Sequence, residues 1–345
     1  MKKSFLVLIL LFMIVITNAQ QYNLLIGTYT NKGNSEGIYV YNFNAKTGES
    51  KLINSVKTTN PSFLTVSKDK KFVYSVNETG KNSEVSSFNF NTLNGELAFL
   101  NKQFTDGENP CYILNDEKNV ISANYSGGSI SVFGRNADGS LTSVKQIVQH
   151  TGKSIDPLKR QLSAHVHQVQ FSQDKKYVIS TDLGEDQIYI YRYNPTSNAQ
   201  ILTLHQVVKT NAGTGPRHLV FSKNGKFAYL AHEFNGSITV FNYTDGDLTK
   251  LQEIGTVEKE YKGKIDGADI HLSADGKFLY ETNRGDLNTI SLFAITKDGR
   301  LTFIETISTL GKGPRNFTID PTGKFLLVAH QYTNDVVIFN RNVNT

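Results

Sequence analysis

The stretch Ser222-Lys-Asn-Gly-Lys-Phe227-Ala-Tyr-Leu-Ala-His232-Glu233, followed by Ile238-Thr-Val-Phe241, decides the fold of this 345-residue chain, because it recurs along the sequence. Each copy has a polar turn that ends in Lys and an aromatic residue, then an apolar run that ends in polar residues. The aromatic residue falls at Phe72, Tyr177, Phe227, Phe278 and Phe325, with a weaker copy near residue 120. The chain therefore consists of units of roughly 50 residues.

Each unit predicts four short strands. Residues 216–221 alternate in polarity, 227–232 are apolar enough to be buried on both faces, 237–241 alternate again, and 248–254 complete the unit. Gly, Asn and Asp between these runs are typical of hairpin turns. No window has a long apolar period of 3.6 residues, so we expect almost no helix. Four antiparallel strands per repeat predict an all-β chain folded as a seven-bladed β-propeller.

The count of strands predicts an incomplete blade where the two ends of the chain meet. Inner strands begin near residues 61, 109, 165, 215, 267 and 313, and residues 24–56 provide second, third and fourth strands for a seventh blade. We expect one propeller domain over residues 20–345, with the closing blade incomplete at the C-terminus. Because the sequence stops at the turn after a third strand, we also expect a truncated chain with unpaired strand edges at the seam.

The first 19 residues predict a signal peptide. Lys2 and Lys3 precede an apolar run over residues 5–16, and Thr17-Asn-Ala19 offers small residues before a cleavage site. The apolar run is shorter than the ~20 residues of a spanning helix, so we expect a periplasmic or secreted protein with no membrane contact after cleavage. Cys111 is the only cysteine, which excludes an intramolecular disulfide. The net charge of +5, without a basic run, gives no case for a nucleic-acid partner.

Polar residues recur at two registers that should face one mouth of the propeller channel. His167, Arg217 and Arg315 are equivalent in the inner strands, and His218 follows one of them. The ends of the second strands supply a further ring: Asn77, Glu78, Asp182, Glu233, Asn283, Arg284 and His330. Such residues could satisfy one another around a water-filled channel, because a buried polar group is costly unless it is hydrogen-bonded. For the ring as a whole we favour a ligand site.

The three arginines expected at this mouth, Arg217, Arg284 and Arg315, should repel one another. Glu78 and Glu233 can offset two of these charges as ion pairs between blades, and the surplus favours a substrate with a phosphate or carboxylate. His165 and His167 alternate along one strand and could ligate a metal, but no third ligand is visible at a clear spacing. We therefore expect no metal and no cofactor.

The segments Gly215-Pro-Arg-His-Leu-Val-Phe-Ser222, His165-Val-His167 and Asn283-Arg-Gly285 resemble the lactonase family of seven-bladed propellers. That family contains propeller-type 6-phosphogluconolactonases and fungal carboxymuconate lactonizing enzymes. The resemblance covers essentially the whole chain after the leader. It implies a catalytic set of His167, Arg217, Glu233 and Arg284. The substrate-binding residues that we expect around this set are His165, His218, Asn283, Arg315, Asn77, Glu78, Asp182 and His330.

The expected function is hydrolysis of a sugar lactone, either 6-phospho-D-glucono-1,5-lactone or a related aldonolactone, by a monomeric carboxylic ester hydrolase. A general base must take a proton from water, and His167 and Glu233 are both candidates. Arg217 and Arg284 would hold the oxyanion or an acid group of the substrate. Two alternatives stay open: an exported propeller that binds without catalysis, and reversible lactonization of a muconate-type dicarboxylate.

Overall fold

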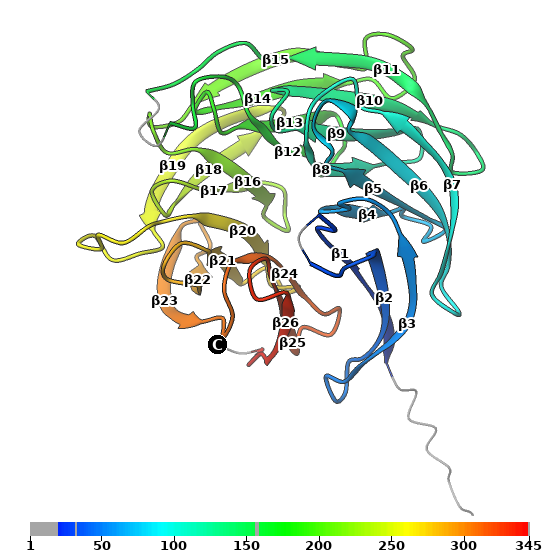
Figure 1. The fold of residues 1–345 in the computed structure, drawn as a ribbon. Helices are drawn as coiled ribbons and strands as arrows, with labels where there is room; N and C mark the ends of the chain where they lie inside the picture. Colours follow the sequence, from blue (N-terminus) through cyan, green and yellow to red (C-terminus); the bar gives the residue numbers. More distant parts are fainter. Residues whose placement is uncertain (1–19, 32, 156–158, 344–345) are drawn as a thin grey trace, which may run out of the picture.

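The computed structural model describes residues 20–31, 33–155 and 159–343, so the predicted signal peptide lies outside the described residues. Seven antiparallel sheets are arranged around a central channel (Figure 1). The helical content of the described residues is one 3-10 turn, Gly80–Asn82. The prediction of an all-β, seven-bladed propeller is confirmed. No helix in the described ranges is long and apolar enough to cross a membrane.

Five sheets have four strands each, and the first and last have three. In chain order the sheets are β1 (Gln21–Gly27), β2 (Gly37–Asn44), β3 (Ser50–Lys57); β4 (Leu64–Val66), β5 (Phe72–Asn77), β6 (Glu84–Asn91), β7 (Glu96–Phe104); β8 (Pro110–Asn115), β9 (Asn119–Asn124), β10 (Ser129–Arg135), β11 (Leu141–Gln149); β12 (Val166–Phe171), β13 (Tyr177–Asp182), β14 (Gln187–Tyr193), β15 (Leu202–Lys209); β16 (Pro216–Phe221), β17 (Phe227–His232), β18 (Ser237–Thr244), β19 (Asp247–Gly255); β20 (Gly267–Leu272), β21 (Phe278–Asn283), β22 (Thr289–Ile295), β23 (Leu301–Ser308); and β24 (Pro314–Ile319), β25 (Phe325–His330), β26 (Asp335–Asn340).

The two three-stranded sheets meet at the seam of the ring. The first strands of six successive sheets lie side by side around the channel, from β4 through β24. By the repeat, β1 corresponds to a second strand, so the first sheet contains second, third and fourth strands. The last sheet contains first, second and third strands. Figure 1 shows β1 (blue) and β24–β26 (red) facing each other across this seam.

The repeated polar turn is built from side-chain hydrogen bonds to the backbone. The hydroxyl of Ser222 accepts from the backbone N–H of Phe227 (3.0 Å) and donates to Oδ1 of Asn224 (2.7 Å). Gly225 has φ +69°, which a glycine adopts without strain. The same hydroxyl bond recurs from Ser273 to the N–H of Phe278 (3.0 Å). The repeated motif therefore encodes the hairpin that joins the first and second strands.

The core lies in layers between neighbouring sheets, not in one central mass. One layer joins Tyr229, Val240 and Ile238 of one sheet to Leu279 and Phe293 of the next, all 4% exposed or less. Because each sheet buries both faces against its neighbours, no sheet has an independent core.

We expect Phe241→Ala to lower the free energy of unfolding by about 3–5 kcal/mol, because the ring is 2% exposed and its removal leaves a cavity. The matched change Phe104→Ala, at a side chain that is 59% exposed, should cost less than about 1 kcal/mol. Urea unfolding followed by circular dichroism measures both. Equal losses for the two variants would contradict the layered core.

Candidate functional site

A shared β-bulge aims one side chain of each inner strand at the channel. The pairing between first and second strands is interrupted near the start of the inner strand in five sheets. It skips one residue in four of them, for example between Pro216 and His218, and two residues, Ala268 and Asp269, in β20. A bulge leaves the extra residue out of the ladder and redirects its side chain. The side chains so placed, with cavity-lining Ser62 at the same register, are Cys111, His167, Arg217, Ala268 and Arg315.

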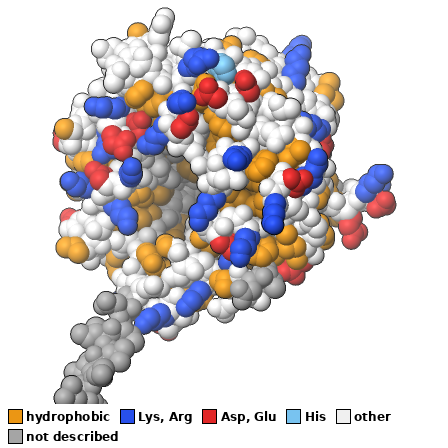
Figure 2. All heavy atoms as spheres, turned by 180° about the vertical axis from the view of Figure 1, so that it is seen from behind, with side chains coloured by type: hydrophobic (Ala, Val, Ile, Leu, Met, Phe, Trp, Pro, Cys, Tyr) orange, Lys and Arg blue, Asp and Glu red, His pale blue; other side chains and the backbone are white. Residues whose placement is uncertain are grey.

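Two adjoining cavities occupy the channel. One of about 440 Å³ opens at the mouth and is lined by charged residues, among them Arg160, Glu233 and Arg284. The other, of about 650 Å³, extends between the first and last sheets. His167 and Arg315 line both. On the face shown in Figure 2 the molecule is hollowed, with hydrophobic side chains inside the hollow and Lys and Arg side chains around it.

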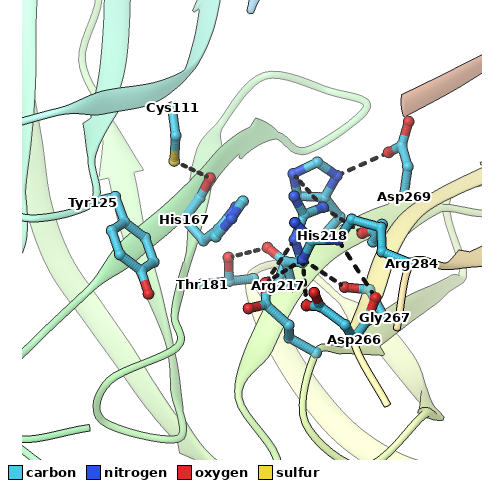
Figure 3. A network of polar contacts seen from close by, with 12 residues as sticks. Cys111, Tyr125, His167, Thr181, Arg217, His218, Asp266, Gly267, Asp269 and Arg284 are labelled. Atoms are coloured by element: carbon cyan, nitrogen blue, oxygen red, sulfur yellow. Dashed lines mark hydrogen bonds and ion pairs between the residues drawn. The ribbon is translucent and has the colours of Figure 1, made fainter. Parts of the chain in front are cut away.

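One buried carboxylate holds three guanidinium groups at the mouth. Oε2 of Glu233 lies 2.9 Å from Nε of Arg217 and 3.0 Å from Nη2 of Arg284, and Oε1 lies 2.5 Å from Nη1 of Arg160. Asp266 accepts a further bond from Nη2 of Arg284 at 2.7 Å. Arg217, Arg284 and Asp266 converge in Figure 3. The arrangement is a fixed, positively charged wall.

The charges within this wall shift one another's pKa. Burial alone would raise the pKa of Glu233, but Arg284, Arg217 and Arg160 outweigh it and lower the pKa to about 2. Burial, with repulsion from Arg284 and Arg315, lowers the pKa of Arg217 to about 10. Glu233 and Arg217 therefore remain charged at neutral pH. Glu233 is therefore an anchor for arginines and a poor proton acceptor.

His167 is an uncharged base at the meeting point of the two cavities. Its side chain is 3% exposed, and its Nδ1 has no hydrogen-bond partner within the described residues. Burial, together with repulsion from Arg217 and His218, lowers the pKa of His167 well below its usual value. The rings of Tyr125 and His218 contact it edge-on, at centroid distances of 5.6 and 5.1 Å. A neutral imidazole nitrogen in this position can accept a proton.

Asp269 orients the neighbouring His218. Its Oδ1 lies 2.8 Å from Nδ1 of His218, and its Oδ2 accepts from Asn316 at 2.6 Å and contacts His271 at 2.9 Å (Figure 3). Burial and repulsion from Arg217 lower the pKa of His218 to about 4. The neutral imidazole therefore donates from Nδ1 to Asp269, which leaves Nε2 to accept from Nη1 of Arg217 at 3.4 Å.

Arg315 differs from the other arginines of the site. None of the ion pairs among the described residues involves its guanidinium, which lies 5.7 Å from the ring centroid of Tyr29. The Tyr29 hydroxyl donates to Glu78 at 3.1 Å, and the Ser62 hydroxyl also bonds Glu78. Arg315 therefore presents a positive charge to both cavities.

The other predicted site residues lie around this centre at varying distance. His165 stacks on Tyr125 at 4.5 Å and donates to that residue's carbonyl oxygen from Nδ1 at 2.9 Å. His330 lines the larger cavity and bonds Asp335. Asn283 accepts from the backbone N–H of Asp266, behind Arg284.

Two predicted residues form hydrogen bonds with partners outside the channel cavities. Asn77 donates to Thr58 and Thr59 and accepts from Ser86. Asp182 contacts His150 at 2.7 Å, and neither side chain lines a channel cavity.

The sequence analysis missed several residues of the site. Arg160 lies in a long connection outside the repeat, so no register could place it. Asp269 follows Ala268 in an inner strand, at the register of His218 and Asn316, and that register was available as a signal. The further residues that it missed are Tyr29, Cys111 and Asp266.

One group of residues in the described ranges has a spacing compatible with a metal. His150, Asp182 and Glu185 place ligand atoms within 4.8 Å of one another. However, the two nitrogens of His150 already bond Asp182 and the hydroxyl of Tyr191, both at 2.7 Å. The Glu185 carboxylate accepts from Gly152 N–H and from the Tyr189 hydroxyl. These bonds account for the group as an internal hydrogen-bond network.

Comparison with known proteins gives a consistent result. A family model described as "Lactonase, 7-bladed beta-propeller" matches residues 23–345. A 6-phosphogluconolactonase of Formosa agariphila is 36% identical over 93% of this chain and 92% of its own, and one of Bacillus subtilis is 34% identical over 93% and 91%. The solved structure of a Pseudomonas aeruginosa periplasmic gluconolactonase has a TM-score of 0.89 at 37% identity, covering 93% and 92% of the two chains.

We expect Glu233→Gln to lower the free energy of unfolding at pH 7 by about 3 kcal/mol, because three guanidinium groups lose their shared counter-ion. The folded-state pKa of about 2 lies below the usual 4.5, so this stabilisation is complete above pH 4.5 and is lost as pH falls toward 2. Urea unfolding at several pH values should show the difference from the wild type shrinking over that window. Glu36→Gln, at an exposed ion pair, is the control; a difference that does not change with pH would contradict the assignment.

Proposed function

This chain belongs to the lactonase family of seven-bladed β-propellers, and we propose that it is a carboxylic ester hydrolase that opens a sugar lactone. The observation that supports the chemistry best is the free nitrogen of a neutral histidine beside a fixed wall of arginines. A lactone is an ester, so the reaction needs a base for water and positive charge near the carbonyl oxygen.

His167 is the proposed general base. Its imidazole is neutral at pH 7, lines both cavities and makes no hydrogen bond with the described residues, so the ring can take the proton of an attacking water. Glu233, the other candidate, uses its oxygens on three arginines and has a pKa of about 2. A carboxylate so acidic and so engaged is a weak base, which favours the histidine.

Arg284 and Arg217 are the proposed electrostatic groups. Glu233 and Asp266 hold the Arg284 guanidinium in one orientation at the mouth. Charges that are fixed before the reaction stabilise a developing oxyanion without the cost of reorganisation. Negative charge that forms on the lactone carbonyl during attack by water would face this wall. When the ring opens, the leaving alkoxide takes the proton that His167 accepted from water, and the product is the open acid.

The proposed substrate is a lactone that carries an anionic group, with 6-phosphogluconolactone as the first candidate. Arg315 has no ion-pair partner among the described residues and lines both cavities, so it can receive a phosphate or carboxylate. Two relatives are 6-phosphogluconolactonases, whereas the Pseudomonas aeruginosa neighbour is a periplasmic gluconolactonase. Together with residues 1–19, that neighbour supports the proposal that the enzyme is exported, and an uncharged aldonolactone is then the second candidate.

We expect His167→Asn to lower kcat by about 10²–10⁴-fold, the usual contribution of a general base. His205→Asn, on an outer strand where His205 contacts Asp247, should leave kcat unchanged. Acid release from glucono-δ-lactone and its 6-phosphate, corrected for spontaneous opening, measures both variants. A loss of less than tenfold at His167 would remove it from the mechanism.

The pH profile gives an independent test of the base. Because the pKa of His167 lies well below 6.5, the imidazole stays deprotonated when the medium is mildly acidic. We expect kcat/KM to be constant from pH 8 to pH 6 and to fall only at lower pH. An inflection near pH 6.5 would indicate an ordinary exposed histidine as the base.

Arg315→Met tests the anionic substrate. We expect KM for the phosphorylated lactone to rise by about 10–100-fold, corresponding to the loss of one charge-assisted contact. KM for glucono-δ-lactone should change by less than about twofold, because that substrate has no charge for Arg315 to bind. Equal changes in KM for both substrates would show that Arg315 does not bind the phosphate.

A further inference from the structure

Tyr125 occupies the same register as two residues of the charged wall, Glu233 and Arg284. Each of the three is the first residue after the second strand of its sheet. In each case its backbone N–H donates to the carbonyl oxygen just before the first strand, at 2.8 or 2.9 Å. Tyr125 also lines the cavity of about 440 Å³ at the mouth. Its side chain therefore enters the channel from the same position in the blade as the charged wall does.

The hydroxyl of Tyr125 has a proton to donate. Nη2 of Arg160 lies 2.6 Å from the hydroxyl oxygen, and a guanidinium only donates, so the tyrosine oxygen accepts in this bond. The O–H group has no acceptor among the described residues. Burial raises the pKa of Tyr125 above its usual value, so the phenol keeps its proton at neutral pH. An O–H group that accepts from a cation is also a stronger donor, because hydrogen bonds in a chain polarise one another.

Arg160 is held between Tyr125 and the charged wall. Its Nη1 lies 2.5 Å from Oε1 of Glu233. Its guanidinium carbon lies 5.9 Å from the ring centroid of Tyr125 and 5.1 Å from that of Phe234, within the range of cation–π attraction. Because both terminal nitrogens already have partners, Arg160 is suited to orient the phenol.

The connection that carries Arg160, between β11 and β12, is fixed to the turn after β13. His150 at its start contacts Asp182 at 2.7 Å, and the backbone N–H of His165 at its end donates to Asp182 at 2.8 Å. Gln161, next to Arg160, donates to a backbone carbonyl of the same turn at 2.7 Å. One buried carboxylate therefore holds both ends of the connection, which gives the network around His150 a role in placing Arg160.

We propose that Tyr125 is a further catalytic residue, whose hydroxyl donates a hydrogen bond to the carbonyl oxygen of the lactone while Arg160 holds it in position. This inference rests on the proposed lactone hydrolysis. The rings of Tyr125 and His167 meet edge-on at 5.6 Å (Figure 3), so the two groups act on neighbouring atoms. His167 takes the proton of the water that attacks the carbonyl carbon, and Tyr125 binds the oxygen of that carbonyl.

This hydrogen bond strengthens as negative charge develops on the carbonyl oxygen. It therefore stabilises the transition state more than the bound substrate, and its loss lowers kcat more than it raises KM. The phenol keeps its proton throughout, so no covalent step passes through Tyr125. Its donor adds to the charge of Arg217 and Arg284, which face the same developing anion.

The test is the kinetics of Tyr125→Phe, which removes the hydroxyl and keeps the ring. We expect kcat to fall by about 10²-fold, as for the loss of one oxyanion donor, and KM to change by less than about threefold. Because every lactone has this carbonyl, the loss should be equal for glucono-δ-lactone and its 6-phosphate. An unchanged kcat, a rise in KM alone, or a loss confined to the phosphorylated substrate would overturn the proposal.

Tyr280→Phe is the matched control. The Tyr280 hydroxyl also accepts from an arginine, Arg341, but the side chain packs in the layer between the last two sheets and lines neither channel cavity. This variant should open both lactones at the wild-type rate. A loss as large as that of Tyr125→Phe would overturn the proposal, because a distant tyrosine–arginine bond would then matter equally.

Arg160→Met tests the positioning role. If Arg160 acts through the phenol, its loss should lower kcat about tenfold in the wild type and less than about twofold in the Tyr125→Phe background. Equal factors in both backgrounds would overturn this role. Wild-type turnover without a loss in Tyr125→Phe would remove Tyr125 alone from the mechanism, whereas no turnover by the wild type would remove the proposed function as well.

Discussion

The arrangement of charge at the channel depends on one buried carboxylate. Glu233 comes directly after β17, and its two oxygens meet arginines from three different parts of the chain. Without that anion, Arg217, with its side chain 1% exposed, would have no ion-pair partner among the described residues. A buried guanidinium is costly to desolvate, so the fold can place several at one mouth only because the carboxylate compensates them. The same compensation makes Glu233 unsuitable as a base and leaves that role to His167.

The fold was predictable because its information is local and repeated. The Ser-x-Asn/Asp turn, the following aromatic residue and the apolar second strand recur in four units, with variants near residues 120 and 325, and each signal has a direct physical meaning in the hairpin. Repetition then fixes the architecture, since a sheet with two apolar faces must stack on its neighbours. Even the three-stranded first and last sheets follow from counting strands in the sequence.

The site was predictable only where it follows the repeat. His167, Arg217 and Arg315 share one register, and that register is the bulge that faces the channel. Arg160 comes from a connection with no counterpart in other units, so periodicity carries no information about it. Not every residue at the end of a second strand reaches the channel. Glu233 and Arg284 lie at the mouth, whereas Asp182 turns toward His150. Which way such a side chain turns depends on neighbours that are distant in sequence.

The recurring bulge has a consequence for how this scaffold diversifies. Since the bulged residue takes no part in the ladder, its side chain can be exchanged without disturbing strand register or the apolar layers. Ser62, Cys111, Ala268 and two arginines accordingly occupy equivalent places around one opening. Architecture and chemistry are thereby uncoupled, and evolution can vary the lining one blade at a time while the ring that carries it stays the same.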